Sequence, residues 1–141
     1  MTTADVALFK LLHQAAPFAW GTRDCVTFVC DALLAFTGRD PGADLRGTYA
    51  TWPEAAARLR QLGGLVALAS ERFGRRLEPA EPLQCGDVVL LERGACEGEG
   101  AEVGALGVVW RGGVLAQGDG GAVWLKGLPY RKAWRPQEMQ S

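Results

Sequence analysis

The sequence predicts one α+β domain in which the helices come first and the strands second. Apolar residues recur with a helical period over residues 3–73, and short strand-like apolar runs fill residues 85–135. A charged segment with two prolines, GRRLEPAEP, separates the two regions. Because helices precede strands instead of alternating with them, the class is α+β, and 141 residues suffice for a single domain spanning 1–141.

Four helices are expected in the first half of the chain. The second has apolar residues at i, i+3, i+4 and i+7 and stops at Gly38. The third opens with a capping box formed by Thr51 and Glu54. The four helices are expected at about residues 5–14, 25–36, 52–62 and 65–73.

The second half of the chain is expected to form an antiparallel sheet of about five strands, on which the helices pack. Gly112-Gly113 and the GDGG run at 118–121 are tight-turn signals between neighbouring runs, which favours a meander. The strand-like runs are DVVLLE, ALGVVWR, GVLAQG, AVWLKG and RKAWR.

Composition excludes several classes of partner. Lys plus Arg number 15 against 16 Asp plus Glu, so the charge balance offers no attraction for nucleic acid or an anionic membrane. No apolar run reaches the roughly 20 residues of a spanning helix. The first residues, MTTADVALFKLLHQ, lack the pattern of a secretory signal peptide, so we expect a soluble protein without one.

The cysteines do not predict a metal site or a disulfide. Residues 25, 30, 85 and 96 contain no C-x-x-C pair, and the chain has one histidine, so we expect no metal and no cofactor. Cys25 and Cys30 are five positions apart, which on a helix turns them roughly 140° from each other. The glycine-rich stretch ERGACEGEGAEVGA lacks phosphate-loop and calcium-loop spacing, and we interpret it as a hairpin loop with Cys96 as an ordinary loop thiol.

The pair Asp24-Cys25 is the strongest candidate for chemistry. If Asp24 caps the second helix, Cys25 lies in the first turn, where backbone N–H groups and the helix dipole favour a thiolate. A nucleophile is often activated in this way. The alternative is that a small buried residue simply fits a crowded helix start.

These residues resemble the NlpC-type branch of the papain-like cysteine peptidases. The shared pattern is W-G-x-x-D-C-x-x-F-V at 20–29, followed by a strand that begins GDVV at 86–89. The resemblance implies a papain-like fold, Cys25 as a former or present nucleophile, and bacterial cell-wall peptides as the substrate class. It also implies a histidine where this chain has Ala105, and it assigns Gln117 the role of orienting that histidine.

The only histidine, His13, precedes the cysteine on the first predicted helix. Catalytic geometry depends on positions in space and not on chain order, so His13 stays open as a substitute base. A histidine on an amphipathic N-terminal helix is more commonly a surface residue.

A second resemblance, over residues 17–135, is to a family of tail-module proteins from tailed phages and prophages that share the NlpC-type fold and lack the histidine. Its most specific motifs are GRDP at 38–41 and R-G-x-Y at 46–49. It implies a protein at or near the tail tip, with other tail proteins as partners and peptidoglycan as an alternative partner. The implied location is the virion tail, or the host cytoplasm during assembly.

The candidate binding residues are Trp20, Asp24, Arg46 and Tyr49. For Arg46, an ion pair with Asp40 that pins the long connection after the second helix is favoured over substrate binding. Core packing accounts for most of the large aromatic residues, and those at a rim suit a protein interface.

The sequence is therefore compatible with three functions. The first is a tail structural or assembly protein on a scaffold without working chemistry. The second is an active cell-wall peptidase or amidase that uses Cys25 with another base, and the third is an unrelated α+β binding module.

Overall fold

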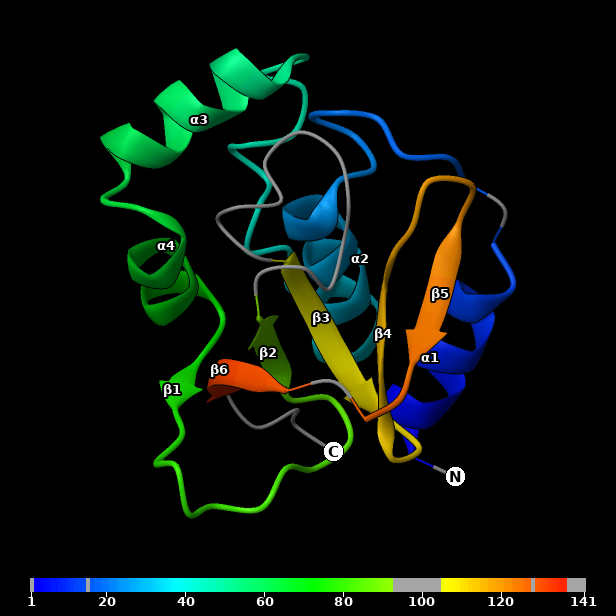
Figure 1. Cartoon of the computed structure of the whole chain (residues 1–141). Coiled ribbons are helices and arrows are strands. Elements are labelled where there is room, and N and C mark those ends of the chain that lie inside the picture. Colours follow the sequence, from blue (N-terminus) through cyan, green and yellow to red (C-terminus); the bar gives the residue numbers. More distant parts are fainter. Residues whose placement is uncertain (1, 15, 93–104, 128, 137–141) are drawn as a thin grey trace.

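The computed structural model describes residues 2–14, 16–92, 105–127 and 129–136. These residues form four helices and a six-stranded antiparallel sheet, which confirms the predicted α+β class. Figure 1 shows α1 (Thr3–Leu12) and α2 (Cys25–Thr37) against one face of the sheet, with α3 (Trp52–Gln61) and α4 (Leu65–Arg72) following along the chain. None of these helices has the length and apolar character needed to cross a bilayer.

Side-chain caps mark the beginnings of α1, α2 and α3. The Thr2 hydroxyl accepts a hydrogen bond from Asp5 N, so α1 begins two residues before the predicted start. Thr51 accepts from Glu54 N as expected for a capping box, but the Glu54 carboxylate accepts from Ala50 N instead of Thr51 N. The predicted third helix is therefore correct, with half of its cap displaced by one residue.

The sheet order is β1-β6-β2-β3-β4-β5. The predicted meander is correct for neighbouring strands from β2 to β5, and it is wrong for β6, which pairs with β2. The prediction also missed β1, which lies inside the charged segment. The strands are β1 (Arg75–Arg76), β2 (Val88–Leu91), β3 (Ala105–Trp110), β4 (Gly113–Gln117), β5 (Ala122–Leu125) and β6 (Tyr130–Arg135).

Burial of β2 explains why β6 crosses to it. All four residues of β2 are buried, so its side chains need cover on both faces and its backbone needs a partner on each side. In a simple meander β2 would be an edge strand. Ala133 and Trp134 of β6 lie opposite Val89 and Val88 and contribute to the two cores on either side of the sheet.

Two apolar clusters result. The larger lies between the helices and the sheet, and it contains Val29 and Phe36 of α2 together with Leu106 and Val108 of β3. The smaller lies on the opposite face and contains Val89, Val109 and Val114 among others. Most of the glycine-rich stretch expected to form a hairpin loop, including Cys96, falls outside the described residues.

Trp134 is the largest fully buried side chain, and its indole N–H donates to Ser70 Oγ on α4 at 3.1 Å. We expect Trp134→Ala to lower the free energy of unfolding by about 3–5 kcal/mol, because the cavity lies between sheet and helices. Trp134→Phe keeps most of the packing and should cost clearly less. Urea unfolding followed by circular dichroism measures both; an unchanged midpoint for the alanine variant would contradict this packing.

Candidate functional site

The candidate site lies where α2 begins, at the end of the sheet where β3 starts and β4 stops (Figure 1). Two hydrogen bonds tie the loop before α2 to this end of the sheet. Phe18 N donates to the Asp119 carbonyl at 2.8 Å, and Gln117 Nε2 donates to the Ala16 carbonyl at 2.8 Å. These bonds fix the loop that leads into α2 to the end of β4, and so they help to position the first turn of α2.

Asp24 is the N-cap of α2 and is almost completely buried. Its Oδ1 accepts from Val26 N at 3.0 Å and Thr27 N at 2.9 Å. Its Oδ2 accepts from Gly21 N at 2.9 Å and from the Tyr49 hydroxyl at 2.7 Å. The Thr27 hydroxyl accepts from Asp24 N at 2.9 Å and completes the capping box, so four donors satisfy one carboxylate.

Gly21 is required by close packing at this point. Its φ is +87°, and a Cβ atom there would lie 2.0 Å from the carbonyl oxygen of Tyr49. Gly47 N also donates to the Gly21 carbonyl at 3.0 Å, which joins the loop before α2 to the connection after it. Backbone conformation and capping thus account for the glycine and the aspartate of the W-G-x-x-D pattern.

Cys25 follows as the first residue of α2 and is half-buried against the larger core. As the sequence predicts, it forms no disulfide with Cys30. Burial raises the pKa of the Cys30 thiol to about 12, despite the opposing charge of Arg46, so Cys30 stays protonated at neutral pH. Burial, and then the charge of Asp24, raise the pKa of Tyr49 above its ordinary value, so this hydroxyl keeps its proton and donates.

The ring of the chain's single histidine contacts a residue of α1. His13 caps the C-terminus of α1, and its ring lies edge-on to Phe9 at 4.6 Å. Phe9 in turn lies 6.4 Å from the ring of Trp110, at the end of β3. The start of β3, next to the beginning of α2 in Figure 1, carries the buried Ala105. Among the described residues, no group of three His, Cys, Asp or Glu side chains is arranged to hold a metal ion.

Gln117 has a structural task in this geometry. Besides the Ala16 carbonyl, its amide nitrogen donates to the Gly118 carbonyl at 2.8 Å. Both bonds hold backbone at the end of β4. Its role as an orienting residue for catalysis stays a prediction.

The expected pair of Arg46 and Asp40 is confirmed, although both side chains are half-buried and not fully buried. Arg46 Nε donates to Asp40 Oδ2 at 2.8 Å and Nη2 donates to Oδ1 at 3.3 Å. Arg46 Nη1 also lies 2.7 Å from Asp31 Oδ1, and Arg23 Nη1 lies 3.1 Å from Asp31 Oδ2. The sequence analysis missed Arg23 and Asp31. The one signal for them is Asp31 itself, a charged residue within the otherwise mostly apolar second helix.

An aromatic cluster stands beside the capped helix start. Trp20 contacts Phe18 edge-on at 4.8 Å and lies 5.5 Å from Trp52, the first residue of α3. All three side chains are half-buried. Tyr49 is a core residue as expected, whereas Trp20 is half-buried and lies at the rim of the core.

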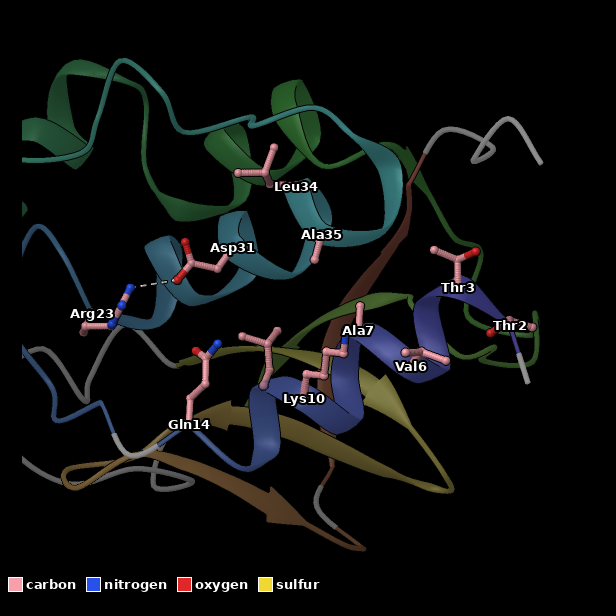
Figure 2. A pocket seen from close by; sticks show the side chains of 11 residues that line it. Thr2, Thr3, Val6, Ala7, Lys10, Gln14, Arg23, Asp31, Leu34 and Ala35 are labelled. Atoms are coloured by element: carbon pink, nitrogen blue, oxygen red, sulfur yellow. Dashed lines mark hydrogen bonds and ion pairs between the residues drawn. The ribbon is translucent and has the colours of Figure 1, made fainter.

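A groove of about 690 Å³ runs between α1 and α2. Figure 2 shows the Arg23–Asp31 ion pair near one end and Thr2 and Thr3 near the other. Leu34 at its side is 43% exposed. The remaining lining residues are Val6, Ala7, Lys10, Leu11, Gln14 and Ala35.

We expect Tyr49→Phe to lower the free energy of unfolding by about 1–3 kcal/mol, because it removes one of four donors from a buried carboxylate. Tyr49→Ala should cost about 3–5 kcal/mol, since it also removes the ring. Chemical denaturation of the two variants separates the hydroxyl from the ring. Equal stability of Tyr49→Phe and wild type would mean that the bond to Asp24 contributes nothing net.

The Asp40 pair predicts a pH dependence of stability. Its hydrogen bond to Arg46 holds the pKa of Asp40 below the ordinary 3.8. The stabilisation is therefore fully present well above pH 3.8, falls below it, and is lost as the pH passes through the lower folded-state value. The stability difference between wild type and Asp40→Asn should be constant above about pH 5 and shrink below pH 4.

Asp44→Asn is the matched control for that experiment. Arg72 likewise lowers the pKa of Asp44, but the Asp44 side chain is 57% exposed, so solvent screens the pair. We expect a smaller difference from wild type at every pH. A larger effect for Asp44→Asn than for Asp40→Asn would contradict the ranking by burial.

Comparison with known proteins adds a family. A search of curated proteins and a search of solved structures each find no match. One family model, described as a domain of unknown function (DUF6950), matches residues 3–136. This match includes the capped helix start, the Asp40–Arg46 connection and all six strands. The chain therefore belongs to the DUF6950 family.

Proposed function

We propose that this protein is a structural or assembly component of a phage tail, built on a papain-like, NlpC-type scaffold whose cysteine site no longer catalyses. The observation that carries the proposal is the state of Asp24, the carboxylate next to Cys25. All four of its described hydrogen bonds hold the loop, the helix start and Tyr49 together. The polar group nearest the thiol along the chain therefore serves the fold.

The arrangement of elements supports the scaffold part of the proposal. A helix with cysteine in its first turn packs against β3 and β4 of an antiparallel sheet. Gly107 in β3 lies where a Cβ atom would approach Val114 Cγ1 to 2.3 Å, which accounts for the glycine in the motif A-L-G-V-V. These are the elements that the resemblance to the NlpC-type branch requires.

The chemistry that a cysteine peptidase needs supports the loss of activity. Such an enzyme needs a base for the thiol and an acid that protonates the leaving amine. Tyr49 retains its proton and donates a hydrogen bond to Asp24, so it is poorly suited as a base. The only imidazole of the chain contacts Phe9 on α1, and the strand position expected to carry histidine is Ala105.

Two surfaces suit a role in assembly. The half-buried cluster of Phe18, Trp20 and Trp52 offers large aromatic area at low side-chain entropy cost. The groove between α1 and α2 offers a second, partly apolar contact surface.

The position of Cys25 favours one alternative function. A thiol in the first turn of a helix, half-buried and not fully covered, is placed where a thiolate is stabilised. Under this alternative the protein is a cell-wall peptidase or amidase with Cys25 as nucleophile and a base other than the family's histidine.

The pH dependence of alkylation at Cys25 tests the two functions. The assembly role predicts a Cys25 reaction that rises near the ordinary thiol pKa of about 8.5, with buried Cys30 unreactive. Peptide mapping after iodoacetamide treatment gives the rate at each cysteine. Fast alkylation well below pH 7, together with release of peptides from purified peptidoglycan, would establish the alternative and overturn the proposal.

Complementation of a tail-gene deletion tests the assembly role directly. Deleting the gene should abolish tailed particles in electron micrographs, and both wild type and Cys25→Ser should restore them. Cys85→Ser, at an exposed thiol far along the chain, is the matched control. If particles assemble without the protein, the proposal fails; if Cys25→Ser alone fails at normal protein level, Cys25 has a chemical task.

A further inference from the structure

The two edges of the sheet differ in chemistry. At one edge, β1 has only two residues, both arginine and both exposed. At the other edge, β5 has the sequence Ala-Val-Trp-Leu without a charge. Short charged edge strands resist pairing with another chain, whereas longer apolar ones invite it. The composition of β1 thus disfavours pairing at that edge of the sheet, and the composition of β5 favours it at the other.

Strand β5 is an edge strand with two exposed apolar side chains, one of which is fixed by a hydrogen bond. Within the described parts of the chain its ladder is with β4 alone. Val123 is 38% exposed and Trp124 39% exposed, and alternation along a strand places them on opposite faces. The Trp124 indole N–H donates to the Trp110 carbonyl at 2.9 Å, so this ring is already fixed against the neighbouring turn.

We propose that β5 pairs with β5 of a second copy of this chain, antiparallel and about a twofold axis, so that the two sheets become one. The charges at the ends of the strand support a like partner. Asp119 precedes β5 and Lys126 follows it, and both are exposed. With antiparallel pairing, the Lys126 end of each strand lies beside the Asp119 end of the other, so a positive and a negative charge are near each other, one position out of direct register, at both ends of the paired strands.

The side chains of β5 are self-complementary about its centre. A twofold axis at Val123 places Val123 opposite its own copy and Ala122 opposite Trp124. A small residue then faces a large one on each side of the axis, and the exposed Val123 and Trp124 of both copies lie at the shared seam. Among possible partners, a second copy meets these requirements of charge and size without further assumptions.

Sedimentation of the full chain over a range of concentrations tests the interface. We expect wild type to dimerise and Val123→Lys to dissociate more than about tenfold more readily, because two like charges then face each other. Val123→Thr keeps a β-branched residue and is the matched control, expected to dimerise with at most a small loss. Circular dichroism and thermal unfolding verify that each variant folds.

If Val123→Lys does not fold, variants that exchange the charges of Asp119 and Lys126 test the same interface. Asp119→Lys alone and Lys126→Asp alone should each weaken the dimer, and the double variant should restore it, since both pairs reverse together. A wild type that stays monomeric, even if it pairs with a strand of another protein, overturns the proposal. So does a dimer that neither Val123→Lys nor the charge variants weaken.

Discussion

The buried carboxylate of Asp24 is the interaction on which the rest of the site depends. It joins three segments that are separate in sequence: the loop before α2, the first turn of α2 and the connection that carries Tyr49. A buried charge is tolerated only where donors surround it, and here every described bond comes from one of these segments. If one segment moved away, the carboxylate would lose a donor that water could not easily replace.

The same hydrogen bonds give Asp24 a structural role, although Asp24 and Cys25 resemble a catalytic pair in sequence. Asp24 and Cys25 look like a catalytic pair in sequence, yet the first is occupied with the fold and the second lacks a histidine at the position the resemblance assigns. Arg46 and its two carboxylate partners then fix the glycine-rich connection from the outside. Under the proposed assembly role, three surfaces would carry the function: the aromatic cluster beside Asp24, the groove between α1 and α2, and the uncharged edge of β5.

The sheet illustrates how burial determines connectivity. Strand β2 is buried on both faces, so it occupies an interior position and receives β6 as a second neighbour. Because β6 pairs with β2 and not with β5, strand β5 lies at the edge of the sheet, and no other strand among the described residues pairs with its outer side. The crossing of one strand thus buries the centre of the sheet and exposes the apolar strand at its side.

Local information in the sequence determined the class, the four helices of the described residues, the turns between β3 and β5, and the ion pair of Arg46 with Asp40. These features depend on period, capping and glycine, which act over a few residues. Only tertiary structure decided that β6 joins β2, that Tyr49 donates to Asp24 across 25 positions, and that Arg23 and Asp31 extend the ion pair. Such contacts depend on which faces are buried together, and no local pattern along the chain specifies that.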